Sequence, residues 1–171
     1  KLEEGRRRRE ILDRRVEDYA AGRLLASRGL YRASAVELAY AIEFHLKAAL
    51  GEVKLDDSDQ RLVESSHDLP RIFGLCRKYD VLASARVSLD FLCLARDHFE
   101  RRYPRGEHAL MEREKYMRDG QDTLPVYDDC IIQLDLALAA DYDTTDFLLG
   151  TGALHAFPFI PALAESIFAG N

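Results

Sequence analysis

The stretch ERRYPRGEH, residues 100–108, contains residue types suited to chemistry on a phosphate. A histidine can move a proton near neutral pH, and an arginine can hold and neutralise a phosphate. Arg102 and His108 are six positions apart, so an unbroken helix would place them on different faces. Pro104 and Gly106 break a helix, and this break would let the chain fold back and bring the pair together. The alternative is an ordinary helix end that carries charge.

A second basic group lies near the start of the chain. Four arginines occupy residues 6–9, and Arg14 and Arg15 follow shortly after them. Six arginines in one short stretch could track a phosphate backbone. The alternative is a solvated, partly frayed terminus whose charge is balanced by nearby acidic residues. These acidic residues are Glu3, Glu4, Glu10 and Asp13.

Glu43 and Lys47 are four residues apart, in the order that favours an ion pair on a helix. Glu43 lies beside an apolar stripe, so we expect it to be partly buried and paired. Helical pairs of this kind need no function to exist, so a structural role competes with phosphate binding by Lys47. His45 lies at the edge of the same stripe and is expected to be a packing residue with its hydrogen bonds made.

The sequence predicts neither a metal site nor a cofactor. The neighbours His67–Asp68 and Asp97–His98 are of metal-binding types. However, no second histidine at i, i+4 and no cysteine pair joins them to complete a ligand set.

Composition favours one domain of 171 residues, because 47% of them are hydrophobic, enough for one sizeable core. The net charge of −6 means that any nucleic-acid contact must come from a local basic patch. Three cysteines without a CxxC pair argue against a disulfide framework and favour a reducing, cytoplasmic setting. The basic N-terminus lacks the apolar run of a signal peptide, and the first residue is Lys1, which leaves the native start open.

Apolar residues recur at helical steps almost everywhere, and nothing alternates convincingly with period two. Residues 52–66 are polar and acidic, and we expect a connection there with at most one short turn. Ser66 or Asp68 should cap the short helix that follows. The expected helices lie within residues 11–25, 31–50, 65–80, 82–103 and 125–140. The sequence therefore predicts an all-α fold over residues 1–146, an antiparallel bundle of four to five helices.

Residues 147–171 form an apolar tail without Lys or Arg. His155, Glu165, two glycines and two prolines interrupt the run of roughly 20 apolar residues that a membrane span needs. We therefore expect a tail that docks on its own bundle or on a partner and does not cross a membrane.

Four motifs occur in an order that resembles the HEPN family, over roughly residues 14–140. The first, A-x-x-L-L-x-x-G-x-Y-x-x-A, has its glycine one step late. Its residues are Ala21, Leu24, Leu25, Gly29, Tyr31 and Ala35. The A-x-E-x-x-L-K-A-x-L helix supplies Ala41, Glu43, Leu46, Lys47, Ala48 and Leu50. The H-D-L segment and the R-Y-P helix end supply His67, Asp68, Leu69, Arg102, Tyr103 and Pro104.

The resemblance implies a HEPN-like helical bundle that forms a homodimer and is often encoded with a minimal nucleotidyltransferase. Many members are metal-independent RNases or toxins, with an arginine and a histidine four to six residues apart assembled at the dimer interface. Arg102 and His108 fit that spacing as catalytic residues. In RNase members the residue after the arginine is usually polar, whereas Tyr103 follows here, and the R-Y-P form is associated with nucleotide binding or an accessory role.

Two hypotheses follow from the residues and the resemblance together. In the first, the chain is a dimeric nucleotide- or RNA-binding module, a partner of a nucleotidyltransferase. Its phosphate-binding residues are Arg101, Arg105 and Lys47. In the second, it is a metal-independent, toxin-like endoribonuclease that uses Arg102 and His108. A purely structural dimerisation domain is a third alternative.

Overall fold

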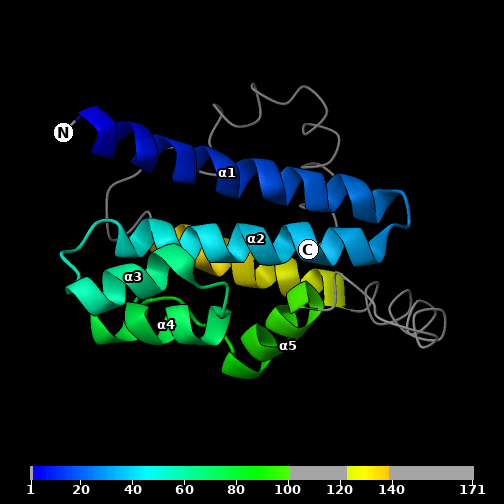
Figure 1. The fold of residues 1–171 in the computed structure, drawn as a ribbon. Coiled ribbons are helices and arrows are strands. Elements are labelled where there is room, and N and C mark those ends of the chain that lie inside the picture. Colours follow the sequence, from blue (N-terminus) through cyan, green and yellow to red (C-terminus); the bar gives the residue numbers. More distant parts are fainter. Residues whose placement is uncertain (1, 101–122, 139–171) are drawn as a thin grey trace.

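The computed structural model of the chain describes residues 2–100 and 123–138. Every regular element in these two ranges is an α-helix, and neither range contains a β-strand, which confirms the predicted all-α class. The labelled helices in Figure 1 are α1 (Leu2–Ser27), α2 (Tyr31–Leu50), α3 (Asp57–Ser65), α4 (Leu69–Lys78) and α5 (Leu89–Glu100). Residues 123–138 form a further helix, drawn in yellow. The predicted tail at 147–171 lies outside the described residues.

Helix α2 forms the centre of the packed structure, and its bounds match the predicted 31–50. Apolar residues at helical spacing make one continuous face, and Leu38, Ile42, Leu46 and Leu50 have no exposed surface. Figure 1 shows α1 along one side of α2, α3 and α4 on another, and the helix at 123–138 passing behind. Burial of these side chains supplies most of the driving force for folding.

A tight turn makes α1 and α2 antiparallel neighbours. Gly29, in the left-handed region with φ +72, and Leu30 close the end of α1 through backbone bonds to Ala26 and Leu25, both 2.9 Å long. This is the Schellman arrangement, which satisfies carbonyls at a helix end. Farther along, the two helices approach closely at Gly22, where an added Cβ would lie 2.6 Å from Leu38 Cγ.

The face that helix α1 turns inward agrees only in part with its apolar residues. The helix is also longer than the predicted 11–25. Of the apolar residues at helical steps in that range, Tyr19 is buried as expected, whereas Leu24 is half exposed. The polar residues Arg15 and Asp18 are buried beside Tyr19. The physical reason is that Asp135 and Asp128, on the helix at 123–138, accept hydrogen bonds from Arg15 and Tyr19.

The prediction for residues 52–66 was wrong, because they contain the nine-residue helix α3. Asp56 caps it by accepting hydrogen bonds from the backbone N–H groups of Ser58 and Asp59. Val63 is the only buried residue of α3, so the helix has too few apolar positions to produce a visible period. Lys78 and Tyr79, at the end of α4, bind the acidic end of α3.

Helix α4 begins where the sequence predicts, with Asp68 as its N-cap and Pro70 in the first turn.

Helix α5 starts at Leu89 and not at residue 82, where the apolar period predicts its start. Leu82 is buried but has a positive φ of 57, a conformation that a helix cannot continue through. Ser88 then starts α5, since its Oγ accepts from the N–H of Phe91. Residues 101–103 of the predicted helix lie outside the described residues.

The helix at 123–138 confirms the prediction for residues 125–140 as far as the structure describes them. Its predicted core residues are all buried. They are Tyr127, Cys130, Ile131, Leu134 and Leu138.

Candidate functional site

Of the residues predicted for the site, only Lys47 lies in the described part of the chain. The others, Arg101, Arg102, Arg105 and His108, fall in the range 101–122 that the structure does not describe. The helix that leads to them is anchored: His98 Nδ1 lies 2.9 Å from Tyr127 Oη, and the ring of Phe91 meets that of Tyr127 edge-on at 4.9 Å. The last described turn of α5 is thus held against the helix at 123–138.

Two of the motif segments meet at one buried carboxylate. Glu43 on α2 accepts from Lys47 Nζ at 2.7 Å and from His67 Nδ1 at 2.9 Å. Lys47 is one helical turn along α2, whereas His67 comes from the connection between α3 and α4, 24 positions away. The carboxylate itself is buried, and half of the His67 side chain is exposed. We call these three residues the Glu43 cluster.

The Glu43 cluster fixes the position of two basic side chains. A carboxylate only accepts hydrogen bonds, so the Nδ1 of His67 carries the proton in this contact. The ring of Tyr40 meets that of His67 edge-on at 6.3 Å, which restricts the imidazole further. A lysine ammonium has three N–H donors, and the bond to Glu43 uses one. The ion pair between Glu43 and Lys47, which their four-residue spacing predicts, is present. Phosphate binding by Lys47 stays a prediction.

A second buried network joins three helices. Asp135 accepts from Arg15 Nη1 at 2.8 Å, and its Oδ1 lies 3.2 Å from His45 Nε2. His45 Nδ1 lies 2.6 Å from the carbonyl oxygen of Ala41, so both ring nitrogens face acceptors. The prediction that His45 is a packing residue with its bonds made is confirmed, since its side chain has no exposed surface.

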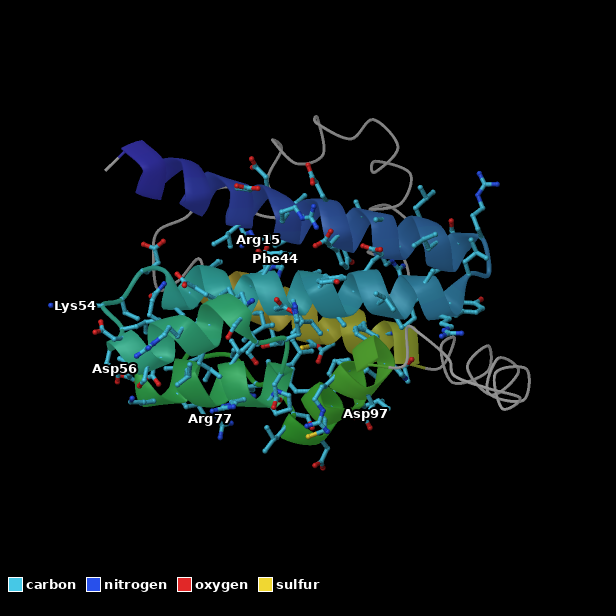
Figure 2. The ribbon with its side chains drawn as sticks, viewed as in Figure 1. Arg15, Phe44, Lys54, Asp56, Arg77 and Asp97 are labelled. Atoms are coloured by element: carbon cyan, nitrogen blue, oxygen red, sulfur yellow. The ribbon has the colours of Figure 1, made fainter. Side chains whose placement is uncertain are left out.

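This network corrects the sequence interpretation of Arg15. The residue was grouped with Arg6–Arg9 and Arg14 as part of an exposed basic run, but it is 1% exposed and paired with a buried carboxylate. It therefore cannot contact an RNA backbone in this fold. Figure 2 shows Arg15 at the side of α1 that faces α2. No local signal identifies this role, because the partner is 120 positions away.

Farther along α1, Asp128 binds two more residues of the same helix. Tyr19 donates to its Oδ1 at 3.1 Å, and Arg23 Nη1 lies 2.9 Å from its Oδ2. Burial raises the pKa of the Tyr19 hydroxyl, and the nearby Asp128 charge raises it further. Burial also raises the pKa of Asp128, opposed by Arg23. The two networks hold the helix at 123–138 antiparallel to α1.

Asp18 is buried on α1 between Arg15 and Tyr19. Within residues 2–100 and 123–138 its Oδ2 accepts no hydrogen bond, and its ion pair with Arg14 spans 3.9 Å. Burial raises the pKa of Asp18 to about 6, and the carboxylates of Glu37, Glu17 and Glu43 add to the effect while Arg14 opposes it. A carboxyl group that titrates near neutral pH inside the α1–α2 contact makes this contact sensitive to pH.

The described residues include no group of three or more His, Cys, Asp or Glu placed to hold a metal ion. Cys76, Cys93 and Cys130 are free thiols, and burial raises the pKa of Cys76 and Cys130 to about 12. Among the helices that the structure describes, none is long and apolar enough to cross a membrane.

Comparisons with models of known protein families, with curated proteins and with solved structures give no match to this chain.

Proposed function

We propose that this chain is a HEPN-like helical domain that binds a nucleotide or RNA, acts as a homodimer and serves as the partner of a minimal nucleotidyltransferase. The observation that carries the proposal is the meeting of Lys47 and His67 on the carboxylate of Glu43. These residues belong to two separate motifs of the resemblance, and the fold places them in contact.

The cluster offers the chemistry that phosphate recognition needs. Lys47 carries a positive charge, and both Lys47 and His67 place ring or ammonium nitrogens against the carboxylate of Glu43. Both side chains are held in place before a ligand arrives, which reduces the entropy lost on binding. Lysine and histidine donors on a rigid helical scaffold are suited to a phosphate group.

The sequence around the R-Y-P motif, residues 102–104, supplies further residues suited to phosphate binding. Arg101, Arg102 and Arg105 follow α5 directly and supply three further guanidinium groups. In this proposal they contact phosphates and break no bond.

Binding and cleavage are separated by one experiment. The purified protein is incubated with mixed RNA in EDTA, beside Arg102→Ala and His108→Ala, and binding is measured in parallel by fluorescence anisotropy. We expect RNA binding without cleavage, and weaker binding by Arg102→Ala. Cleavage by the wild type that is lost in both variants would support the metal-independent endoribonuclease instead, and absence of binding would end the proposal.

The role of the Glu43 cluster has its own test. Lys47→Gln should weaken RNA binding and reduce the slope of log affinity against log salt by about one. Lys54→Gln, at an exposed lysine after α2, is the matched control and should leave the slope unchanged. Equal slopes for Lys47→Gln and wild type would remove Lys47 from the binding site.

A further inference from the structure

The helix at 123–138 has apolar side chains on its outer side as well as on its inner side. Side chains on its inner side bind α1, α2 and α5, and in Figure 1 the helix passes behind α2. On the outer side Val126 is 45% exposed and Leu136 is 51% exposed. The outer side of a helix normally carries polar and charged residues, so large apolar side chains there need a reason beyond folding.

Four of the outer residues lie on one stripe of this helix. Val126, Asp129, Gln133 and Leu136 follow each other at steps of three, four and three residues, and each is exposed or partly exposed. Steps of three and four are those of the seam between two packed helices. Ile132, one turn before Leu136, is also partly exposed and does not belong to the hydrophobic core. We call the four residues the 126–136 stripe.

The 126–136 stripe is complementary to itself when a second copy runs antiparallel. Positions 126 and 136 are five residues on either side of position 131, and positions 129 and 133 are two residues on either side of it. A two-fold axis that crosses the helix at position 131 therefore places Val126 against Leu136 of the second copy. The same axis places Asp129 against Gln133 of the second copy, where the amide N–H can donate to the carboxylate.

This pattern favours a second copy over other occupants of the face. A two-fold contact needs a surface that is complementary to itself, whereas an unrelated protein or another segment of this chain does not. An anionic membrane surface attracts basic residues, and residues 123–138 include no Lys or Arg. The polar pair also fixes the register, because a shifted helix would set Asp129 against an apolar side chain.

We propose that the 126–136 stripe is the contact surface of a homodimer in which two copies of the helix at 123–138 pack antiparallel about a two-fold axis. The inference rests on the homodimer of the proposed function and names the surface that forms it. A stripe from a single helix buries less than the roughly 800 Å² per partner of a standard interface, so we expect a dimer that dissociates reversibly.

Sedimentation velocity of the full chain over a series of concentrations measures the dimer. We expect the wild type to shift from monomer to dimer with a dissociation constant in the micromolar range. Leu136→Asp should raise this constant about a hundredfold, because the substitution removes an apolar contact twice in each dimer. Leu24→Asp, at a leucine of α1 that is 52% exposed, is the matched control and should leave the constant unchanged.

An exchange of charge tests the antiparallel register. Gln133→Glu should raise the dissociation constant about tenfold, because it sets a carboxylate against Asp129 of the second copy at two places. Adding Asp129→Asn restores an amide and a carboxylate in each pair, so the double variant should return to the wild-type constant. Neither side chain is buried, and circular dichroism checks that each variant is folded. In a parallel dimer position 133 would face itself, and the double variant would stay weak.

The outcomes distinguish this inference from the function on which it rests. If the wild type dimerises and Leu136→Asp dimerises equally well, this surface is wrong and the homodimer of the proposed function stands. A double variant that stays as weak as Gln133→Glu would overturn the antiparallel arrangement. A wild type that is monomeric at every concentration overturns both the homodimer and this surface. Dimerisation that Leu136→Asp abolishes, in a chain that binds no RNA, would support this surface and end the RNA-binding proposal.

Discussion

The guanidinium of Arg15 lies 2.8 Å from the carboxylate of Asp135, and both side chains are almost completely buried. The contact ties α1 to the helix at 123–138, and His45 of α2 joins it through the same carboxylate oxygen. Charges removed from water in this way are tolerated only when each is paired.

Asp135→Ala should therefore destabilise the protein strongly. It removes the buried carboxylate to which Arg15 donates, and we expect the free energy of unfolding to fall by about 3–5 kcal/mol, measured by urea denaturation. The double variant Arg15→Met with Asp135→Leu removes both charges and should recover much of this loss. A loss below about 1 kcal/mol in the single variant would show that the pair does not support the fold.

Asp18→Asn should stabilise the protein at pH 7.5. The carboxyl has a pKa of about 6 in the folded state against 3.8 when unfolded, so its charge opposes folding above pH 6 and the penalty disappears below pH 3.8. The full shift corresponds to roughly 3 kcal/mol, and the buried amide of Asn offsets part of it, so we expect a gain of about 1–2 kcal/mol.

The pH dependence checks the cause of that gain. As pH falls from 7.5 to 4.5, the wild type should gain stability from this group, and its difference from Asp18→Asn should shrink. A constant difference across this range would mean that the effect is not due to titration of Asp18.

Glu43→Ala should cost about 2–4 kcal/mol, because Lys47 and His67 lose the buried carboxylate that accepts from both. The thermal unfolding midpoint gives the measurement. Glu10→Ala, at an exposed position of α1, is the control and should change stability by less than about 0.5 kcal/mol. Equal effects for both variants would contradict the role of the cluster.

Gly22→Ala and Gly74→Ala should change stability in opposite directions, although both replace a glycine within a helix. At Gly22 the new Cβ would meet Leu38 Cγ at 2.6 Å, so α1 must move away from α2 at a cost of about 1–3 kcal/mol. At Gly74 nothing lies within 4 Å, and alanine should add about 0.5–1 kcal/mol through its helix propensity. Chemical denaturation of both variants measures the contrast.

The sequence predicts most of the helices because their apolar residues repeat with a clear period. The core face of α2 and that of the helix at 123–138 agree with the predicted residues, down to Tyr127 and Leu138. The periodicity fails at α3, which buries only Val63, and before α5, where the positive φ of Leu82 depends on the surrounding packing. At α3 the missed signal is a local cap, in which Asp56 accepts from the N–H groups of Ser58 and Asp59, and hydrophobic periodicity does not detect it.

The candidate site was predictable only where both partners lie close in sequence. The pair of Glu43 and Lys47 follows from the four-residue spacing, whereas His67 reaches the same carboxylate only after α3 and the following turn have formed. For Arg15 the sequence predicts the wrong environment, because a run of arginines suggests an exposed side chain and Arg15 is buried. Its distant partner Asp135 reverses that expectation.

The chain reversal at Gly29 bears on the order in which the protein folds. The contacts between α1 and α2 span short sequence separations, so the two helices can pair early, at a low entropic cost of loop closure. The contact between Arg15 and Asp135 closes a loop of 120 positions, so we expect the helix at 123–138 to dock on α1 after α1 and α2 have paired. In pulsed hydrogen exchange during refolding, amides of α2 should become protected before those of residues 123–138.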